Sequence, residues 1–234
     1  MTASRVDEFL DLYKQLEQAL RLRSETSSGK YPATVAALTY SRGMEDYAED
    51  LNAVRETRNL LQHNPKIDGA YLVEPSAETI EFLRKILKMV EEPKLAIDYA
   101  VSEKQIYKTD LNASLRKVMR VMKDRGFSHI PVMNGSKVIG VLSVNILFDY
   151  FAETGGEIDP EVKVSALADL IAVDKHSNEY YKFMKSDATF DEVDEAFMKR
   201  YQGKKRLVAV FLTSNGSADG NLLAMLTPWS VVGK

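Results

Sequence analysis

The stretch SHIPVMNGSKVIGVLS, residues 128–143, contains two short apolar runs on either side of an Asn134-Gly135 pair. Runs rich in β-branched residues are typical of buried strands, and Asn-Gly between two such runs favours a tight hairpin turn. The preceding stretch SLRKVMRVMKDRG has a helical pattern and ends in Gly126, which suits the position just after a helix. The order helix, strand, turn, strand therefore predicts a unit that mixes helices with a sheet.

The same order of elements occurs again further along the chain. Residues 116–143 can be laid on residues 191–227, which include the strand-like run RLVAVFLT, a second Asn-Gly pair and a longer loop. The stretch TFDEVDEAFMKRYQG predicts the helix of this second copy, closed by Gly203. An internal repeat of this kind is typical of two domains that pack about a pseudo-twofold axis with a cleft between them.

The first part of the chain has a helical pattern. Residues 5–22 carry apolar side chains at the i, i+3, i+4 spacing of an amphipathic helix. A second helix is predicted over residues 33–63 with a kink at Gly43, and a third over residues 75–92 with Ser76 as its N-cap. We therefore expect an all-α bundle of three or four helices.

Arg58 interrupts the apolar face of the second helix between Val54 and Leu61. A charge on a buried face is unfavourable unless it is paired or solvated. Three explanations remain open. The guanidinium extends to water, or it pairs with an acid of a neighbouring helix such as Glu8 or Asp11, or it points into a polar site at a seam between helices or subunits.

His63 follows Arg58 by five residues, which is about 140° around a straight helix. Because Asn64 precedes Pro65, and a residue before proline avoids the helical region, the helix is expected to stop at His63. The imidazole can then turn back toward Arg58.

Composition limits the classes of function. The 234 residues include no cysteine, so disulfides, thiolate nucleophiles and zinc-thiolate sites are excluded. The net charge is −3, with 12 basic and 16 acidic residues in the first 92 positions, so any nucleic acid would need a local site. Since we find neither an export signal nor a stretch of membrane-spanning length, we expect a soluble, cytoplasmic protein with no membrane partner.

The remaining histidines do not indicate a metal site. His129 and His176 lack metal-ligand spacing relative to His63, and we expect no metal. We interpret His129 as a core or cleft residue and His176 as exposed.

The repeats resemble a tandem pair of CBS domains, the Bateman module, in the stretches SHIPVMN…VIGVLS and LLAMLTPWSVVG. The family pattern is glycine, two hydrophobic residues and Ser or Thr, followed three residues later by Asp. The hydroxyls are present as Ser143 and Thr227, but Ile146 and Ser230 stand where the family has Asp, and Ala224 replaces the second glycine. The resemblance implies an α+β fold, with a helical bundle (1–92) before two β-α-β-β-α domains, at 93–156 and, after a linker helix, within 157–234.

The CBS resemblance also implies a ligand, an adenine nucleotide or related adenosyl compound such as AMP, ATP or S-adenosylmethionine, bound in the cleft. The family's Asp bonds a ribose hydroxyl, so its absence leaves that role to other groups. The candidate nucleotide-binding residues are Tyr107, Ile130, Pro131 and Trp229 for the base, and Ser143, Asn145, Thr227 and Ser230 for the ribose.

The stretch RNLLQH, residues 58–63, resembles the Arg-Asn-x-x-x-His motif of HEPN domains, helical bundles that dimerise and in many cases are metal-independent endoribonucleases. The resemblance implies a homodimer and an RNA substrate. Histidine suits proton transfer and arginine suits phosphate binding, which makes His63 and Arg58 the candidate catalytic pair, with Asn59 positioning one of them.

Two functions follow from these resemblances. The first is a metal-independent endoribonuclease of HEPN type that is regulated by a nucleotide bound to the CBS pair. The alternative is a non-catalytic dimeric CBS sensor or interaction protein whose helical domain serves dimerisation.

Overall fold

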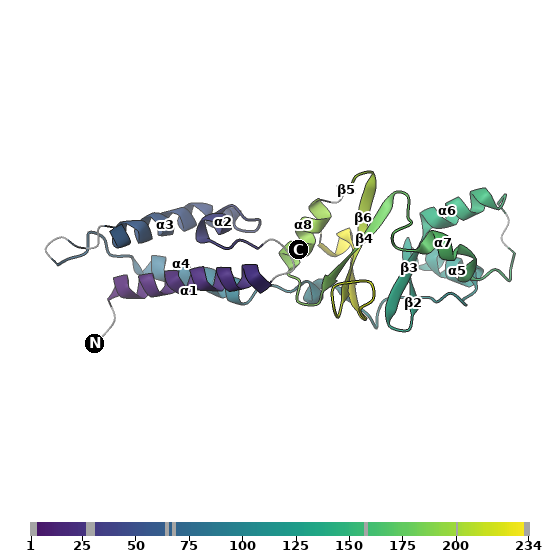
Figure 1. Cartoon of the computed structure of the whole chain (residues 1–234), viewed down its shortest axis with the longest axis horizontal. Coiled ribbons are helices and arrows are strands. Elements are labelled where there is room, and N and C mark those ends of the chain that lie inside the picture. The colour runs from purple at the N-terminus through teal and green to yellow at the C-terminus, as the bar shows by residue number, and fades with distance from the viewer. Residues whose placement is uncertain are drawn as a thin grey trace. The chain divides into compact units, whose positions relative to one another are not determined.

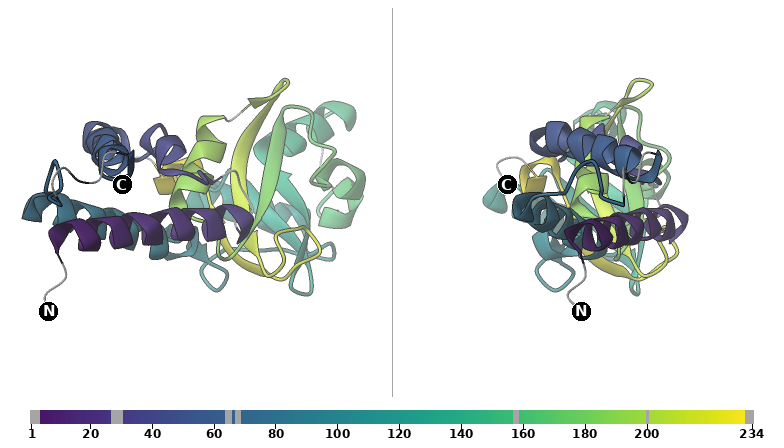
Figure 2. Two further views of the ribbon diagram at one scale, coloured as in Figure 1. Left: turned by 60° about the vertical axis from the view of Figure 1, so that its left-hand side comes forward. Right: turned by 90° about the vertical axis from the view of Figure 1, so that its left-hand side faces the viewer.

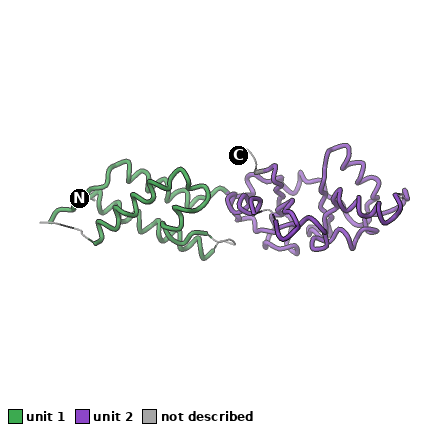
Figure 3. Tube along the Cα trace, turned by 90° about the horizontal axis from the view of Figure 1, so that it is seen from above, with its two compact units in different colours: residues 1–94 green, residues 95–234 purple. Residues whose placement is uncertain are grey.

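The computed structural model describes residues 4–26, 31–63, 66, 69–156, 159–199 and 201–231. Contacts divide the chain into two compact units, Met1–Lys94 and Leu95–Lys234 (Figure 3). The first unit is helical and the second combines helices with sheets, so the chain is of mixed α+β class, with a helical unit ahead of a mixed one.

The first unit contains α1 (Arg5–Thr26), α2 (Val35–Thr39), a 3-10 turn η1 (Glu45–Tyr47), α3 (Ala48–His63) and α4 (Ala77–Glu91) (Figure 1). Helix α1 packs along α4, and α2 packs against α3. Ser76 caps α4 as predicted, since its side chain accepts a hydrogen bond from the Thr79 N–H at 3.2 Å. The apolar stripes predicted for α1 and α4 form the core together with residues of α2 and α3.

The prediction of one kinked helix over residues 33–63 is wrong at residues 40–44. Helix α2 ends at Thr39, and the turn that follows contains Gly43 at φ 81°. This left-handed conformation is readily adopted only by glycine, so the chain breaks here instead of bending. Helix α3 ends at His63, as predicted, while Asn64 and Pro65 lie outside the described residues.

The second unit begins with η2 (Ala96–Tyr99), β1 (Val101–Ser102) and an extended segment in which Thr109 bridges Val132 in parallel. Helix α5 (Leu115–Arg125) ends at Gly126, whose φ of 68° confirms its place after the helix. Strands β2 (His129–Asn134) and β3 (Lys137–Ser143) form the predicted hairpin around Asn134-Gly135, and α6 (Val144–Glu153) follows.

The elements from η2 to α6 form the first half of this unit. The elements from η3 onward form its second half and repeat that arrangement. After η3 (Val164–Leu167) and α7 (Ala168–Ile171) come β4 (Glu179–Lys185), α8 (Phe190–Met198), β5 (Tyr201–Gln202), β6 (Lys205–Thr213), β7 (Leu222–Leu226) and α9 (Pro228–Val231). Strand β4 pairs with β6 in parallel and β6 with β7 in antiparallel. Strand β1 pairs with β7, so the start of the first half completes the sheet of the second.

Gly203 does not close a helix, contrary to the prediction. Helix α8 ends at Met198, and Gly203 lies at φ 62° in the tight turn between β5 and β6, where Gln202 pairs with Lys205. A two-residue hairpin turn needs positive φ, so the same glycine that suits a helix end also suits this turn.

An apolar seam joins the two sheets of the second unit. Helices α5, α6 and α7 lie on the side of the β2–β3 sheet that faces away from β4 and β6 (Figures 1 and 2). Strand β6 is buried on both faces, which explains its uninterrupted apolar sequence. The buried residues of the seam are Ile106, Val138, Val141, Tyr181, Val208, Ala209, Phe211 and Leu222.

Gly140 allows α7 to approach β3. A Cβ built at this position would lie 2.7 Å from the carbonyl oxygen of Ile171 and 3.0 Å from its Cγ1. The contact involves backbone, so a change of side-chain rotamer cannot relieve it.

We predict that Gly140→Ala lowers the free energy of unfolding by about 1–3 kcal/mol, the usual effect of overpacking a closed site. Urea denaturation of the full chain measures this change. Lys137→Ala, an exposed substitution in the same strand, is the control and should change stability by less than about 0.5 kcal/mol. Equal stabilities for the two variants would contradict the close approach of α7.

Candidate functional site

The carboxylate of Glu179 lies where the two halves of the second unit meet. Glu179 is the first residue of β4, and only 3% of it is exposed. Its Oε1 accepts hydrogen bonds from Asn145 Nδ2 at 2.6 Å and lies 3.2 Å from His129 Nε2. Because Asn145 and His129 belong to the first half, this one side chain links β4 to both α6 and β2.

Two further side chains complete the polar cluster around Glu179. His176 Nδ1 lies 3.5 Å from Glu179 Oε2 and 3.3 Å from the hydroxyl of Tyr181, which also donates to Glu179 Oε2 at 3.4 Å. The expectation that His176 is exposed is wrong, since only 1% of it is accessible. Its Nε2 lies 3.3 Å from the carbonyl oxygen of Ile171, so the ring has polar partners on both sides.

The charge of Glu179 is stabilised despite its burial. Burial raises the pKa of this carboxyl, but the hydrogen bonds from His129 and His176, the charge of His129 and the Ser143 hydroxyl together hold the pKa well below its usual range. Burial also raises the pKa of the Tyr181 hydroxyl, as does the negative charge of Glu179. The site therefore holds a carboxylate beside a phenol that stays protonated.

The two residues of the first half that were predicted to bind ribose, Ser143 and Asn145, differ in their exposure. Ser143 is fully buried, and its Oγ caps α6 by accepting a hydrogen bond from the Ile146 N–H at 3.2 Å. Asn145, two residues later, lies at the surface. The structure thus brings Ser143 and Asn145 to one place, with Asn145 as the side chain that a ligand can reach.

The predicted base-binding residues do not all lie together. Ile130 and Pro131 are buried in β2. Tyr107 is half-buried and stacks on Phe127, with ring centroids 6.3 Å apart and an angle of 29° between the planes. The Arg125 guanidinium lies 6.0 Å from the centroid of Tyr107.

The other predicted residues belong to the second half. Trp229 on α9 is 85% exposed. The Thr227 N–H donates to Ser230 Oγ at 3.2 Å, so the residue between β7 and α9 is hydrogen-bonded to a residue of α9. Of the eight predicted nucleotide-binding residues, five therefore belong to the first half and three to the second, with Thr227 after β7 corresponding to Ser143 at the end of β3.

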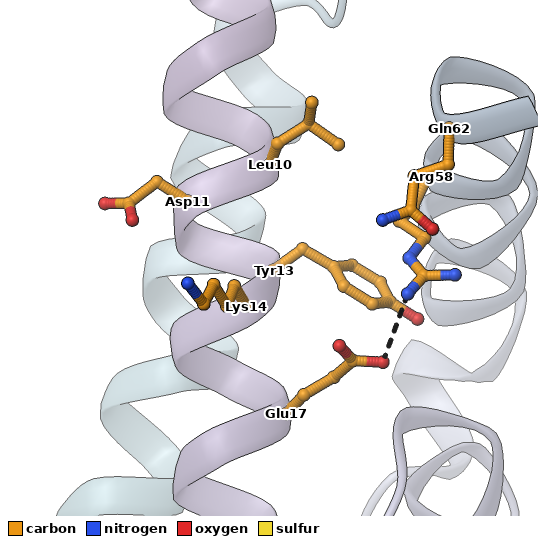
Figure 4. A pocket seen from close by; sticks show the side chains of 7 residues that line it. All are labelled: Leu10, Asp11, Tyr13, Lys14, Glu17, Arg58 and Gln62. Carbon is orange, nitrogen blue, oxygen red and sulfur yellow. Dashed lines mark ion pairs between the residues drawn. The ribbon is translucent and has the colours of Figure 1, made fainter.

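Arg58 lies at a pocket of about 350 Å³ between α1 and α3 (Figure 4). Its guanidinium lies 5.4 Å from the ring centroid of Tyr13, and its Nη2 is 3.8 Å from Glu17 Oε1. The side chain is 25% exposed. The pocket is lined by Leu10, Asp11, Tyr13, Lys14, Glu17, Arg58 and Gln62.

Of the three explanations for Arg58, pairing with a neighbouring helix describes its contacts, but the acid is Glu17. Glu8 forms an ion pair with Arg84 of α4 instead. The carboxylate of Asp11 points away from the guanidinium in Figure 4 and accepts a hydrogen bond from Gln15. Because the guanidinium of Arg58 is partly exposed to water, the free-energy cost of placing its charge on the apolar face of α3 is reduced.

The other two residues of the motif lie on the last turns of α3. Asn59 and His63 are exposed. The Arg58 guanidinium donates to Asn59 Oδ1 at 3.2 Å, so these two side chains do interact.

Comparison with known protein families assigns part of the second unit. Residues 99–153 match the CBS domain. The chain contains a CBS domain. The match covers β2, β3, α5 and α6, and it confirms the CBS prediction for this region.

Several solved structures are similar to part of the chain. A CBS domain-containing protein of unknown function from Bacillus anthracis str. Ames Ancestor is 16% identical, with 59% of this chain and 89% of that chain covered and a TM-score of 0.42. CbpB in complex with c-di-AMP is 14% identical, with 59% of this chain and 82% of that chain covered and a TM-score of 0.44. CBSX2 in complex with AMP is 16% identical, with 59% of this chain and 93% of that chain covered and a TM-score of 0.39. The comparison with curated proteins found no match.

The described residues contain neither a metal-binding cluster nor a helix suited to span a membrane. No group of three or more His, Cys, Asp or Glu side chains is arranged there to hold a metal ion. Within the same residues, no helix has both the length and the apolar character needed to cross a membrane.

The sequence analysis missed Glu179, His176 and Tyr181 as site residues next to the CBS domain. One signal was available. In the stretch EYYKFMK, side chains at alternate positions face the same way in a strand, so Glu179 and Tyr181 share one face. An acid on the inward face of a buried strand indicates a partner, but the sequence does not reveal that His129 and Asn145 supply it.

We predict that Glu179→Gln lowers the free energy of unfolding at pH 7 by about 1–3 kcal/mol, since a buried charge-assisted network is weakened. The difference from wild type should shrink as the pH falls below 4.5, the reference pKa of the group in the unfolded chain. The folded pKa is lower, so the unfolded state takes up the proton first and the stabilisation is lost with falling pH.

Urea denaturation at several pH values between 7 and 3 measures this difference. Glu161→Gln changes an exposed carboxylate in the same unit and serves as the control. A difference between wild type and Glu179→Gln that stays constant over this range would contradict a stabilising charge at Glu179.

Proposed function

We propose that the chain is a regulatory protein whose second unit binds an adenosyl ligand and whose helical unit carries the response. The observation that carries the proposal is the CBS domain at residues 99–153. In the second half, β6 pairs in parallel with β4 and antiparallel with β7, as β2 pairs in the first half with Thr109 in parallel and with β3 antiparallel. CBS domains that pack in pairs bind adenine nucleotides between them, as the resemblance implies. In this proposal the chain consists of a helical domain (1–92), a first CBS domain (93–156) and a second (157–234).

The residues of the first half suit such a ligand. Tyr107 and Phe127 offer aromatic faces beside the Arg125 guanidinium, which fits a base and a phosphate. Asn145 offers amide donors and an acceptor at the surface near the end of β3. Thr227, Trp229 and Ser230 offer the corresponding groups in the second half, which makes two subsites per chain.

Regulation requires the ligand to bind one arrangement of the protein better than another. The two halves meet through the apolar seam and the Glu179 cluster, so a ligand between them is placed to alter their packing. We propose that this change is passed to the helical unit in a cytoplasmic homodimer.

We predict that the full chain binds at least one of AMP, ATP and S-adenosylmethionine in isothermal titration calorimetry. Tyr107→Ala should weaken that binding about tenfold or more, because it removes an aromatic surface for the base. Tyr201→Ala removes an exposed tyrosine of the same unit, on β5, and should leave the affinity unchanged. If wild type binds none of the three ligands, the proposed function is wrong.

A second candidate function, metal-independent RNA cleavage, is favoured by one observation. Arg58 lines a pocket between α1 and α3, while Asn59 and His63 are exposed on the same helix. In this candidate Arg58 binds the phosphate, His63 transfers a proton and Asn59 positions Arg58, with which it is hydrogen-bonded. One chain supplies one motif, so the active unit would be a homodimer that brings two motifs together.

We predict for this candidate that the full chain cleaves RNA in the presence of EDTA, and that Arg58→Ala and His63→Ala each reduce the rate at least about 100-fold. Arg55→Ala, which removes a neighbouring arginine of α3, is the control and should retain activity. Intact RNA with wild type, both with and without the three ligands, would exclude cleavage. Cleavage that survives both substitutions would place the activity elsewhere.

A further inference from the structure

Helices α5 and α8 occupy equivalent places in the two halves of the second unit. Each begins after an N-cap residue that carries a hydroxyl, Ser114 for α5 and Thr189 for α8. Counted from these N-caps, the buried Val118 of α5 corresponds to the buried Val193 of α8. This is the register in which the two copies of the internal repeat align, so the two helices can be compared position by position.

The charges of these helices have opposite sign at equivalent positions. Helix α5 contains five basic residues and one acidic residue, whereas α8 contains four acidic residues and no basic one. Three equivalent positions carry a cation in α5 and a carboxylate in α8: Arg116 and Asp191, Lys117 and Glu192, and Arg120 and Glu195. Five of these six residues are exposed, and Glu192 is half-buried. The cations form a positive face of α5, and the carboxylates form a negative face of α8.

The positive face does not stabilise the helix that carries it. Arg116 and Lys117 lie in the first turn of α5, which contains no acidic residue, although a helix N-terminus favours negative charge. Arg116 and Arg120 are four residues apart, where like charges repel each other. Helix α8 differs, because Asp191 and Glu192 lie in its first turn, where they suit the helix dipole. The cations of α5 are therefore better explained by a partner of opposite charge than by the stability of α5.

Both charged faces lie on the outside of the second unit. The apolar side of α5 packs against β2 and β3, and that of α8 packs against β6 and β7, in separate cores (Figure 1). Exposed apolar side chains lie in the same helical layers. Phe148 on α6, which covers the same sheet as α5, is 72% exposed, and Met198 on α8 is 65% exposed. An interface at these layers could bury apolar area in addition to the charges, which contribute little by themselves.

We propose that the second unit forms a head-to-tail homodimer, in which the positive face of α5 packs against the negative face of α8 of a second copy. In a twofold dimer this contact occurs twice, so both positive faces meet a negative one. A head-to-head dimer places α5 against α5 and α8 against α8, and repulsion between like charges opposes it. The inference rests on the homodimer of the proposed function, because it names the faces through which the two chains meet.

The test exchanges the charges of one equivalent pair, Arg120 and Glu195, in the full chain. We expect Arg120→Glu and Glu195→Arg each to raise the dissociation constant of the dimer about tenfold or more, because each replaces two attractions by two repulsions. The combined variant restores both attractions. An equal mixture of the two single variants does the same in a mixed dimer. Both should therefore dissociate like wild type.

Sedimentation equilibrium at low ionic strength measures these dissociation constants, since salt screens exposed charges. Lys182→Glu reverses an exposed charge on β4 and should leave the dissociation constant unchanged. Because Glu195 also pairs with Lys199 of its own chain, unfolding midpoints are measured for every variant. Arg120→Glu changes no printed ion pair and provides the test if Glu195→Arg does not fold.

A head-to-head dimer gives a different pattern, since the single variants then dissociate like wild type and only their mixture binds more tightly. That pattern, or a dissociation constant that rises for Arg120→Glu alone, overturns the inference and leaves the binding of an adenosyl ligand standing. Assembly beyond a dimer overturns the twofold arrangement. A monomeric wild type overturns both this inference and the proposed homodimer. If that monomer binds RNA and Arg120→Glu does not, the positive face belongs to a nucleic-acid partner instead.

Discussion

Glu179 carries a negative charge at the edge of an apolar seam, and polar side chains from both halves of residues 95–234 are arranged around it. A carboxylate removed from water is unfavourable unless hydrogen-bond donors replace its solvation. Here Asn145 and His129 come from the first half, while His176 and Tyr181 come from the second. The charge therefore requires the two halves to be docked, and the docked state in turn brings an amide and an imidazole to the surface beside α6.

The helical unit accommodates a charge differently. Arg58 stays near the edge of the bundle, where its guanidinium packs over Tyr13, approaches Glu17 and remains partly exposed to water. Such a pair contributes little to stability because solvent screens it. Glu179, in contrast, cannot leave its partners without loss of a buried network.

Much of the candidate site beside α6 follows from local sequence. Ser143 stands where a strand meets a helix, and its hydroxyl caps that helix as such residues usually do. Asn145 lies two residues further on, in the first turn of that helix, and its exposed amide made it a candidate for binding the ribose. Glu179 and His176 could not be assigned because their function depends on partners far away in the chain, and His176 lies in a polar segment that gives no sign of burial. Likewise, Glu8 and Asp11 were as plausible as Glu17 for Arg58, since helix packing decides which turn of α1 faces α3.

The local elements of the chain could be predicted from its residues alone: the helical pattern of the first part, the hairpin at Asn134-Gly135, the helix end at Gly126 and the repeat that contains the CBS domain. Each depends on side-chain periodicity or on backbone preferences within a few residues. The folded structure was needed to show that Gly203 lies in a hairpin turn, that β1 joins the sheet of the other half, and that Glu179 is hydrogen-bonded to Asn145 of α6. These outcomes depend on contacts between residues distant in sequence, whose burial and pairing no local pattern records.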